Sequence, residues 1–306
     1  MGLGIKTAIL SKLQQRSDLK QNLDLSTADY WTGHNVTNHR IFKSTQDSLD
    51  YFAWRNAQYP HYIDLMPVRG FDGKVVLDYG CGPGHDLIGF GTYSKPARLI
   101  GMDLSSSSLS EARARVRLHD FSAEIIQLDP DVRILPFPDA SVDHVHSSGV
   151  LHHVPDVLAI LKELRRVLKP GGTMNVMIYN YDSIWFHLYV AYVKCIVEGL
   201  YTDKSLREAF RHTTDGPNCP ISNVYKPQEW IEICEETGLK ASLKGVAVSL
   251  WECHVLQQHR HMACMNERLP AESRDFLLSL TFDENGFPMW QDRYAGIDGC
   301  YSIARS

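Results

Sequence analysis

Residues 75–86, Val-Val-Leu-Asp-Tyr-Gly-Cys-Gly-Pro-Gly-His-Asp, decide the fold of this 306-residue chain. An apolar run that contains Asp78 passes into a turn with three glycines in five positions. A buried strand that stops at such a turn leaves backbone N–H groups pointing outward, and glycine lets a ligand approach the main chain closely. The glycine spacing alone also fits a dinucleotide-binding fold, so the next ninety residues must separate the two interpretations.

Those residues contain further strand-like segments in a regular order. The third glycine of G-x-G-x-x-G is missing, because positions 85 and 86 are His and Asp. The segment 99–104 reads as a second strand that ends near Asp103, an acid that can accept both hydroxyls of a ribose. Three more strands are expected at 125–129, 142–148 and 174–179, with Leu-Pro-Phe at 135–137, His-His-Val-Pro-Asp at 152–156 and Lys-Pro-Gly-Gly at 169–172.

This ordered set of motifs resembles the class I S-adenosylmethionine-dependent methyltransferases, and among them the ubiquinone/menaquinone-biosynthesis type, which acts on small molecules. The resemblance covers about residues 74–179. Strands that alternate with helical stretches predict an α/β fold with a doubly wound parallel sheet. In this Rossmann-like class the sheet is mostly parallel and has seven strands, with cap segments over its carboxyl edge. Ligands bind beyond the carboxyl ends of such strands, so the motifs should converge on one cleft.

The segments outside this core are expected to form the cap. Residues 1–73 read as an N-terminal cap, which includes an amphipathic helix at 44–59. The methyltransferase core is assigned to 74–179 and 231–306. Cap or lid insertions are assigned to 180–230, with an aromatic helical stretch at 184–200, and to 250–291, between the last two strands.

Composition limits the partners of the protein. The net charge of −5 and the lack of a Lys/Arg run argue against nucleic acid. We see no run of 18 apolar residues, which argues against a membrane span. Seven scattered cysteines suit a reducing cytoplasm. We therefore expect a cytoplasmic enzyme of small-molecule biosynthesis with a small-molecule acceptor. The oligomeric state is open, a homodimer being one option.

The resemblance implies that S-adenosylmethionine is the cofactor, and it indicates which residues should contact each part of this molecule. The backbone of the glycine turn should meet the methionyl end, Asp103 the ribose hydroxyls and Leu104 the adenine face. The adenine amino group should meet Asp129 or Asp131; family spacing favours Asp131 and the strand end favours Asp129. The cofactor-binding set also contains residues around the methionyl group, namely Asp78, Gly80, Cys81, Gly82, Ser148 and Gly149. One of Arg55 and Tyr59 is expected to hold the cofactor carboxylate. The alternative is that Arg55 is an ordinary surface residue and Tyr59 an ordinary core residue.

Methyl transfer from a sulfonium is an in-line displacement whose rate depends mainly on positioning. A hydroxyl acceptor must also lose a proton to a base, and histidine titrates in the right range. His152 and His153 follow the fourth strand at the mouth of the cleft, and His153 is the preferred base. The alternative is that this pair only caps the helix that follows.

Polar and aromatic residues in the cap segments are candidates for acceptor binding. They indicate a polar acceptor with hydroxyl, amine or carboxylate groups. The candidate substrate-binding residues are Tyr30, His34, Asn35, His39, Tyr179, Asn180, His212 and Asp215.

Three other interpretations have specific counter-arguments. A zinc site in the Cys/His-rich segment 253–264 matches no common zinc spacing, so no metal is predicted. A nicotinamide-dependent oxidoreductase would need the missing third glycine. A regulatory protein that binds S-adenosylmethionine without catalysis would not need the histidine pair.

Overall fold

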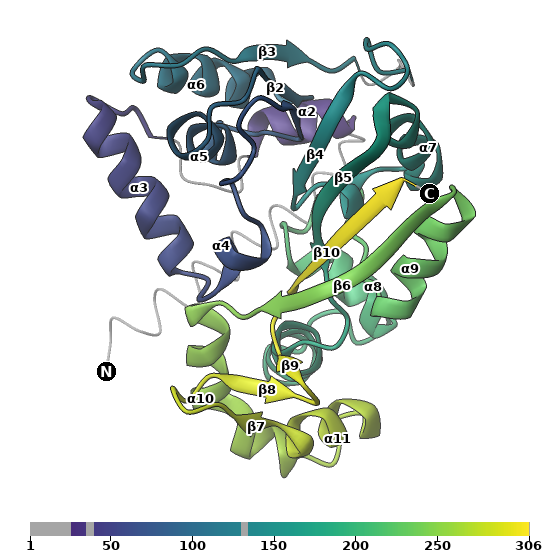
Figure 1. Ribbon diagram of the computed structural model, residues 1–306. Helices are drawn as coiled ribbons and strands as arrows, with labels where there is room; N and C mark the ends of the chain where they lie inside the picture. The colour runs from purple at the N-terminus through teal and green to yellow at the C-terminus, as the bar shows by residue number, and fades with distance from the viewer. Residues whose placement is uncertain (1–25, 35–39, 130–133, 306) are drawn as a thin grey trace.

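A computed structural model describes residues 26–34, 40–129 and 134–305 of the chain (Figure 1). Its centre is a seven-stranded sheet in which β10 alone runs antiparallel to its neighbours. The predicted α/β fold with a mostly parallel seven-stranded sheet is therefore confirmed. From one edge to the other, the strands are β3 (Glu124–Gln127), β2 (Arg98–Asp103), β1 (Val75–Tyr79), β4 (Val142–Ser148), β5 (Leu168–Tyr179), β10 (Asp298–Arg305) and β6 (Leu239–Ala247).

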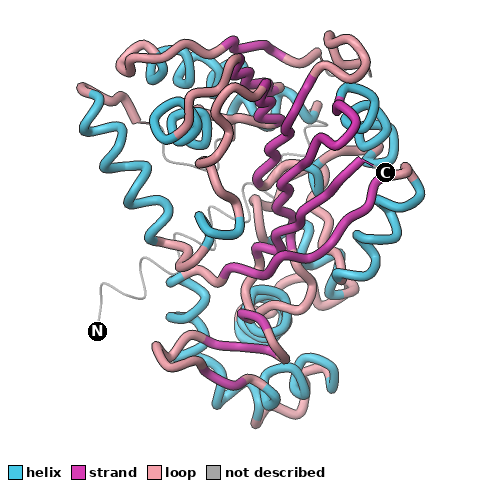
Figure 2. The backbone as a smooth tube through the Cα atoms, viewed as in Figure 1, coloured by secondary structure: helices cyan, strands magenta, loops and turns pink. Residues whose placement is uncertain are grey.

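Helices cover both faces of the sheet (Figure 2). Successive side chains of a strand point to opposite faces, so Val76 packs in the hydrophobic cluster of Phe52 and Leu87, while Leu77 packs with Leu161 and Trp230. Both faces of β1 are buried, which explains why its residues are apolar except for Asp78. One face carries α3 (Thr45–Ala57), α5 (His85–Tyr93) and α6 (Ser106–Val116); the other carries α7 (Val157–Val167) and α9 (Pro227–Glu236).

The register of β10 brings its first residue to the carboxyl edge of the parallel strands. Asp298 pairs with Tyr179 at the end of β5 and with Ala247 at the end of β6. Between β6 and β10 the chain forms two helices and a small antiparallel sheet. These are α10 (Leu250–Cys264), α11 (Ala271–Ser279), β7 (Thr281–Phe282), β8 (Pro288–Trp290) and β9 (Arg293–Tyr294).

In Figure 1, α10 and α11 lie together below the sheet. The remaining elements gather around the same edge. They are α2 (Thr27–Gly33), α4 (Tyr62–Leu65), the short turn η1 (Leu151–His153), the π-helix η2 (Trp185–Val197) and α8 (Leu206–Thr213). The η2 residues Leu188, Ala191 and Tyr192 are buried against α10 and α11 in one hydrophobic cluster, whereas Phe186 packs in another cluster with Phe210 of α8. None of the helices in the described ranges is long and apolar enough for a membrane crossing.

Candidate active site

The glycine turn after β1 folds back onto the end of β2. The N–H groups of Gly80 and Cys81 both donate to the carbonyl oxygen of Met102, at 2.7 and 2.9 Å. Gly80 and Gly82 have φ values of 78° and 51°, which side chains strongly disfavour. A Cβ on Gly80 would lie 2.2 Å from Val150, whereas a Cβ on Gly82 would meet nothing within 4 Å. Gly80 is therefore packed against protein, and the space beside Gly82 is open.

Asp103 joins this turn to the end of β2. Its carboxylate accepts hydrogen bonds from the N–H of Gly82 at 2.9 Å and of Ser105 at 2.8 Å. Burial raises the pKa of Asp103, although these backbone donors oppose the shift. Leu104 is half-buried, and Asp129 is exposed two residues after the end of β3. Asp131 lies outside the described residues.

Arg55 connects α3 to the carboxyl edge of the sheet. Its guanidinium lies 3.3 Å from Asp86 Oδ1 on α5 and 3.5 Å from Ser148 Oγ at the end of β4. Ser148 Oγ is also 2.5 Å from the hydroxyl of Tyr62, whose ring lies 4.9 Å from the guanidinium carbon. His146 Nε2 approaches the other oxygen of Asp86 at 3.2 Å. Arg55 is thus held between Asp86 and Ser148.

The cluster around Arg55 contains residues that the sequence did not indicate. Burial alone would raise the pKa of Asp86, but Arg55 and His146 outweigh burial and lower it, so its carboxylate is charged. In the sequence, Asp86 stands out only as a residue near the missing third glycine, and His146 only as part of an expected strand. Only the fold places both next to Arg55, from positions 31 and 91 residues further along the chain.

Three buried acids surround this cluster at the carboxyl edge. Burial raises the pKa of Asp78 and of Asp298 to about 7, and that of Glu252 on α10 to about 8. Within the described part of the chain, Asp78 Oδ2 and Glu252 Oε1 have no hydrogen-bond partner. Tyr59 is largely buried, and its pKa is raised by that burial and by the charge of Asp298. The carboxyl edge of the sheet therefore holds two buried acids, Asp78 and Glu252, whose hydrogen bonding is incomplete within the described structure.

His152 and His153 both lie in η1, but their rings have different surroundings. His153 Nδ1 lies 2.6 Å from the carbonyl oxygen of Ile221, so it must carry the proton that it donates. Its Nε2 has no hydrogen-bond partner among the described residues and is 3.8 Å from Asp215 Oδ2. The His152 ring packs on Tyr179 with 3.7 Å between centroids, and neither of its nitrogens has a partner in the described structure. Burial lowers the pKa of both histidines.

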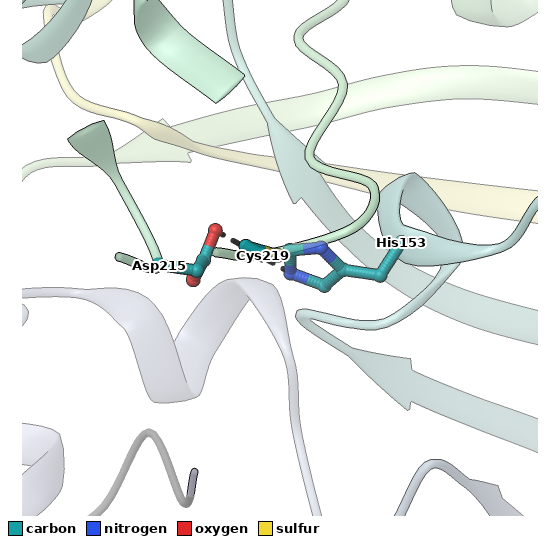
Figure 3. Close-up of side chains that lie close together, drawn as sticks. All are labelled: His153, Asp215 and Cys219. Atoms are coloured by element: carbon teal, nitrogen blue, oxygen red, sulfur yellow. Dashed lines mark ion pairs between the residues drawn. The ribbon is translucent and has the colours of Figure 1, made fainter. Parts of the chain in front are cut away.

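Asp215 lies opposite His153 on the loop after α8 (Figure 3). Its oxygens accept from the Tyr179 hydroxyl at 2.9 Å and from Ser222 Oγ at 2.8 Å, and its backbone carbonyl accepts from the Tyr30 hydroxyl. Three of the predicted acceptor-binding residues, Tyr30, Tyr179 and Asp215, are therefore joined beside His153.

The other predicted acceptor-binding residues have local partners. The side-chain amide of Asn180 donates to the backbone carbonyls of Asp182 and Gly296, at 2.8 and 3.1 Å. His34 stacks on Tyr30, and His212 stacks on Tyr201. Asn35 and His39 lie outside the described residues.

The segment 253–264 does not assemble a metal site. Its cysteines and histidines are spread along α10, where His254 contacts Gln258. Within the described ranges, the one group of three potential metal ligands is His153, Asp215 and Cys219. The sequence did not single out Cys219.

Comparisons with known proteins support this architecture. A family model described as a methyltransferase domain matches residues 77–176. A demethylmenaquinone methyltransferase from Listeria welshimeri is 30% identical over 186 residues, which cover 56% of this chain and 75% of that protein. A 27-O-demethylrifamycin SV methyltransferase from Amycolatopsis mediterranei is 33% identical over 110 residues, covering 36% of this chain and 39% of that protein.

A solved structure shows the same fold. It is phospholethanolamine N-methyltransferase 2 from Haemonchus contortus in complex with phosphomonomethylethanolamine and S-adenosylhomocysteine. It aligns with a TM-score of 0.51 at 16% identity, over 92% of this chain and 60% of that one.

The sheet order, the glycine turn beside Asp103 and these relatives define a class I methyltransferase. The chain belongs to the S-adenosylmethionine-dependent methyltransferase family, and S-adenosylmethionine is the cofactor of that family. Four curated relatives are matched over only 39% to 47% of their own length, less than half.

Proposed function

We propose that this protein transfers a methyl group from S-adenosylmethionine to an oxygen, or alternatively a nitrogen, of a small polar metabolite. The observation that carries this proposal is the orientation of His153. Its Nδ1–H is fixed by the Ile221 carbonyl, which leaves a lone pair on Nε2 without a hydrogen-bond partner in the described structure. A base needs such a lone pair.

The residues at the carboxyl edge fit the cofactor. The space beside Gly82 admits a ligand, and Asp103 has further lone pairs that can accept from ribose hydroxyls. Asp78 Oδ2 has no hydrogen-bond donor in the described structure, so it can accept a hydrogen bond from a ligand. Arg55, beside Ser148, suits a carboxylate. When bound, the cofactor supplies an electrophilic methyl whose C–S bond breaks as the bond to the acceptor forms, while the acceptor proton passes to His153 Nε2.

The protonation state of His153 suits this role at neutral pH. Burial lowers its pKa, and the nearby Asp215 carboxylate and the Ile221 carbonyl only partly oppose that shift. The ring is therefore neutral and can accept a proton. Asp215 would then stabilise the imidazolium that forms, because its Oδ2 is 3.8 Å away.

The surroundings of His153 indicate the kind of acceptor. Tyr30, Tyr179 and Asp215 present hydroxyl and carboxylate groups, and Trp31 lies with its ring centroid 4.7 Å from that of His153. These groups favour a small molecule that has both polar substituents and a flat or apolar part. The relatives named above act on small molecules by name, which agrees with this class. We assign the segments 1–73, 180–230 and 250–291 to a cap that selects this acceptor.

The proposal is tested by following S-adenosylhomocysteine formation with a panel of small hydroxylated and amino compounds. His153→Asn should reduce turnover by about 10²- to 10⁴-fold and leave affinity for S-adenosylhomocysteine within about twofold, because His153 is assigned to the acceptor side. The acid limb of the wild-type pH–rate profile should lie below pH 6.5, the ordinary pKa of histidine, and should vanish in the variant.

His254→Asn, a change on the exposed side of α10, is the matched control and should keep wild-type turnover. Full turnover in His153→Asn would remove the assigned base. Cofactor binding without consumption by any acceptor would instead support a regulatory protein.

A further inference from the structure

Three side chains of different chemistry converge beside η1. A ring nitrogen of His153, a carboxylate oxygen of Asp215 and Cys219 Sγ all lie within 4.8 Å of one another (Figure 3). All three residues are largely buried: the side chains of His153 and Asp215 are only 7% and 3% exposed, and Cys219 is 6% exposed. Nitrogen, oxygen and sulfur ligands in one small cluster are the set that borderline-soft divalent cations use.

The hydrogen bonds around His153 leave an unfavourable contact that a cation would relieve. Because Nδ1 carries the ring proton, the lone pair of Nε2 lies 3.8 Å from Asp215 Oδ2, with no donor from the described residues between them. Two acceptors then face each other in a buried place. A proton on Nε2 or a metal ion between the two atoms would turn this repulsion into attraction.

We propose that His153, Asp215 and Cys219 form a binding site for a divalent cation of the zinc type. In a tetrahedral zinc site, bonds of about 2.0 to 2.3 Å place neighbouring ligand atoms about 3.5 Å apart. The three atoms are at most 4.8 Å apart, and the His153 and Asp215 atoms are 3.8 Å apart, so closing to this geometry needs a contraction of no more than about 1.3 Å. The Cys219 thiol would lose its proton to solvent as the metal–sulfur bond forms, and an outside ligand would complete the coordination.

The groups behind the three ligands are arranged as metal sites require. A metal-bound imidazole generally donates its other N–H to a carbonyl or carboxylate, which fixes the ring; Ile221 does this for His153. Tyr179 and Ser222 donate to Asp215 and hold its carboxylate, while each oxygen keeps a further lone pair. A thiolate and a carboxylate also neutralise the two positive charges of the ion. Without a cation, burial and the charge of Asp215 raise the pKa of Cys219 to about 12 and keep it a thiol.

Occupation of this site has a consequence for catalysis that rests on the function proposed above. A zinc ion would take the lone pair of His153 Nε2, which is the same lone pair that accepts the proton of the substrate. Metal binding and general-base catalysis are therefore mutually exclusive, and zinc should act as a reversible inhibitor of methyl transfer.

The site is tested first by metal binding, without any assay of activity. The full-length protein is stripped with a chelator and titrated with ZnCl₂ in competition with a chromophoric chelator. We expect one tight equivalent, which weakens at least tenfold in Cys219→Ser and in His153→Asn. Cys264→Ser on α10 is the matched control and should bind zinc as the wild type does. Titration of the wild type with Co²⁺ should give a thiolate-to-cobalt charge-transfer band, a result that depends on no variant.

Each outcome decides the proposal. No tight zinc equivalent, no thiolate band, or unchanged binding in Cys219→Ser would overturn the site. Loss of binding in Cys264→Ser would move the ligands to α10 and would also overturn it. If the site is confirmed, zinc should inhibit turnover of the wild type, each sample being normalised to its chelator-treated activity. If zinc binds but His153→Asn keeps full turnover, the proposed base is wrong while the metal site stands.

Discussion

At the scale of single residues, Gly80 and Gly82 show how one turn serves both packing and binding. Both adopt positive φ, so a side chain at either position carries similar backbone strain. They differ in what a Cβ would meet: Val150 at 2.2 Å for Gly80, and open space for Gly82. The first glycine is needed for the fold, and the second leaves room for a ligand.

Alanine substitutions should separate these two roles. Gly80→Ala must displace Val150 as well as bear the strain, so it should destabilise the protein by about 2–4 kcal/mol. Gly82→Ala bears the strain alone, about 1 kcal/mol, but its methyl group enters the ligand space and should weaken S-adenosylhomocysteine binding at least tenfold. Urea denaturation and calorimetry measure the two effects. Wild-type affinity in Gly82→Ala would contradict the position of the cofactor.

At the scale of elements, α3 is fixed to the core by Arg55. This side chain joins α3 to α5 through Asp86 and to β4 through Ser148. The start of the same helix carries an exposed pair between Arg40 and Asp47. Buried and exposed ion pairs differ strongly in what their loss costs, because a buried partner is left without solvent.

Arg55→Ala should therefore be much more destabilising than Arg40→Ala. Loss of Arg55 leaves Asp86 buried with His146 as its one ionic partner among the residues that the structure describes, at a cost of about 3 kcal/mol. Loss of Arg40 should cost less than about 1 kcal/mol. Unfolding in urea, followed by circular dichroism, gives both values. Equal effects would show that the Arg55 cluster does not hold α3.

The sequence predicted the elements of this site better than their partners. The helix at 44–59 is present as α3, and Ser44 caps it by accepting from the N–H of Asp47. The apolar strands and the glycine turn are encoded by residues close together in the sequence, so they could be predicted from it. The partners of Arg55 lie 31 and 93 residues away and become neighbours only through the sheet order. The periodicity of apolar residues in a sequence does not predict such contacts between distant residues.

At the scale of the whole molecule, the segment between β6 and β10 places a buried acid, Glu252, near Asp298 at the carboxyl edge of the sheet. Glu252 lies in the first turn of α10, where one oxygen accepts from the N–H and hydroxyl of Ser249. The pairing of β10 brings Asp298 to the same edge. The sequence suggested an insertion here, but it gave no sign that Glu252 is fully buried.

The buried Glu252 should make stability depend on pH. Its pKa rises from 4.5 to about 8 on folding, so the folded protein keeps a proton that the unfolded chain releases between these values. Unfolding therefore releases a proton in this range, and this contribution to stability falls as pH rises, by at most about 1.4 kcal/mol per pH unit. Thermal melts should show that the stability of Glu252→Gln, relative to that of the wild type, increases as pH rises from 5 to 8. The exposed control Glu267→Gln should show the same pH dependence of stability as the wild type. The same pH dependence in Glu252→Gln would show that Glu252 is not buried as described.

Calorimetric titration with S-adenosylhomocysteine tests the central claim, that the turn amides and Asp103 form one cofactor site. The wild type should bind, and Asp103→Ala should lose about 2 kcal/mol, or roughly 30-fold in affinity, because a buried hydrogen-bonding acid is removed. Asp120→Ala, at an exposed acid, is the control and should bind normally. A wild-type protein that binds neither S-adenosylhomocysteine nor S-adenosylmethionine, or a folded Asp103→Ala variant with undiminished affinity, would contradict the account.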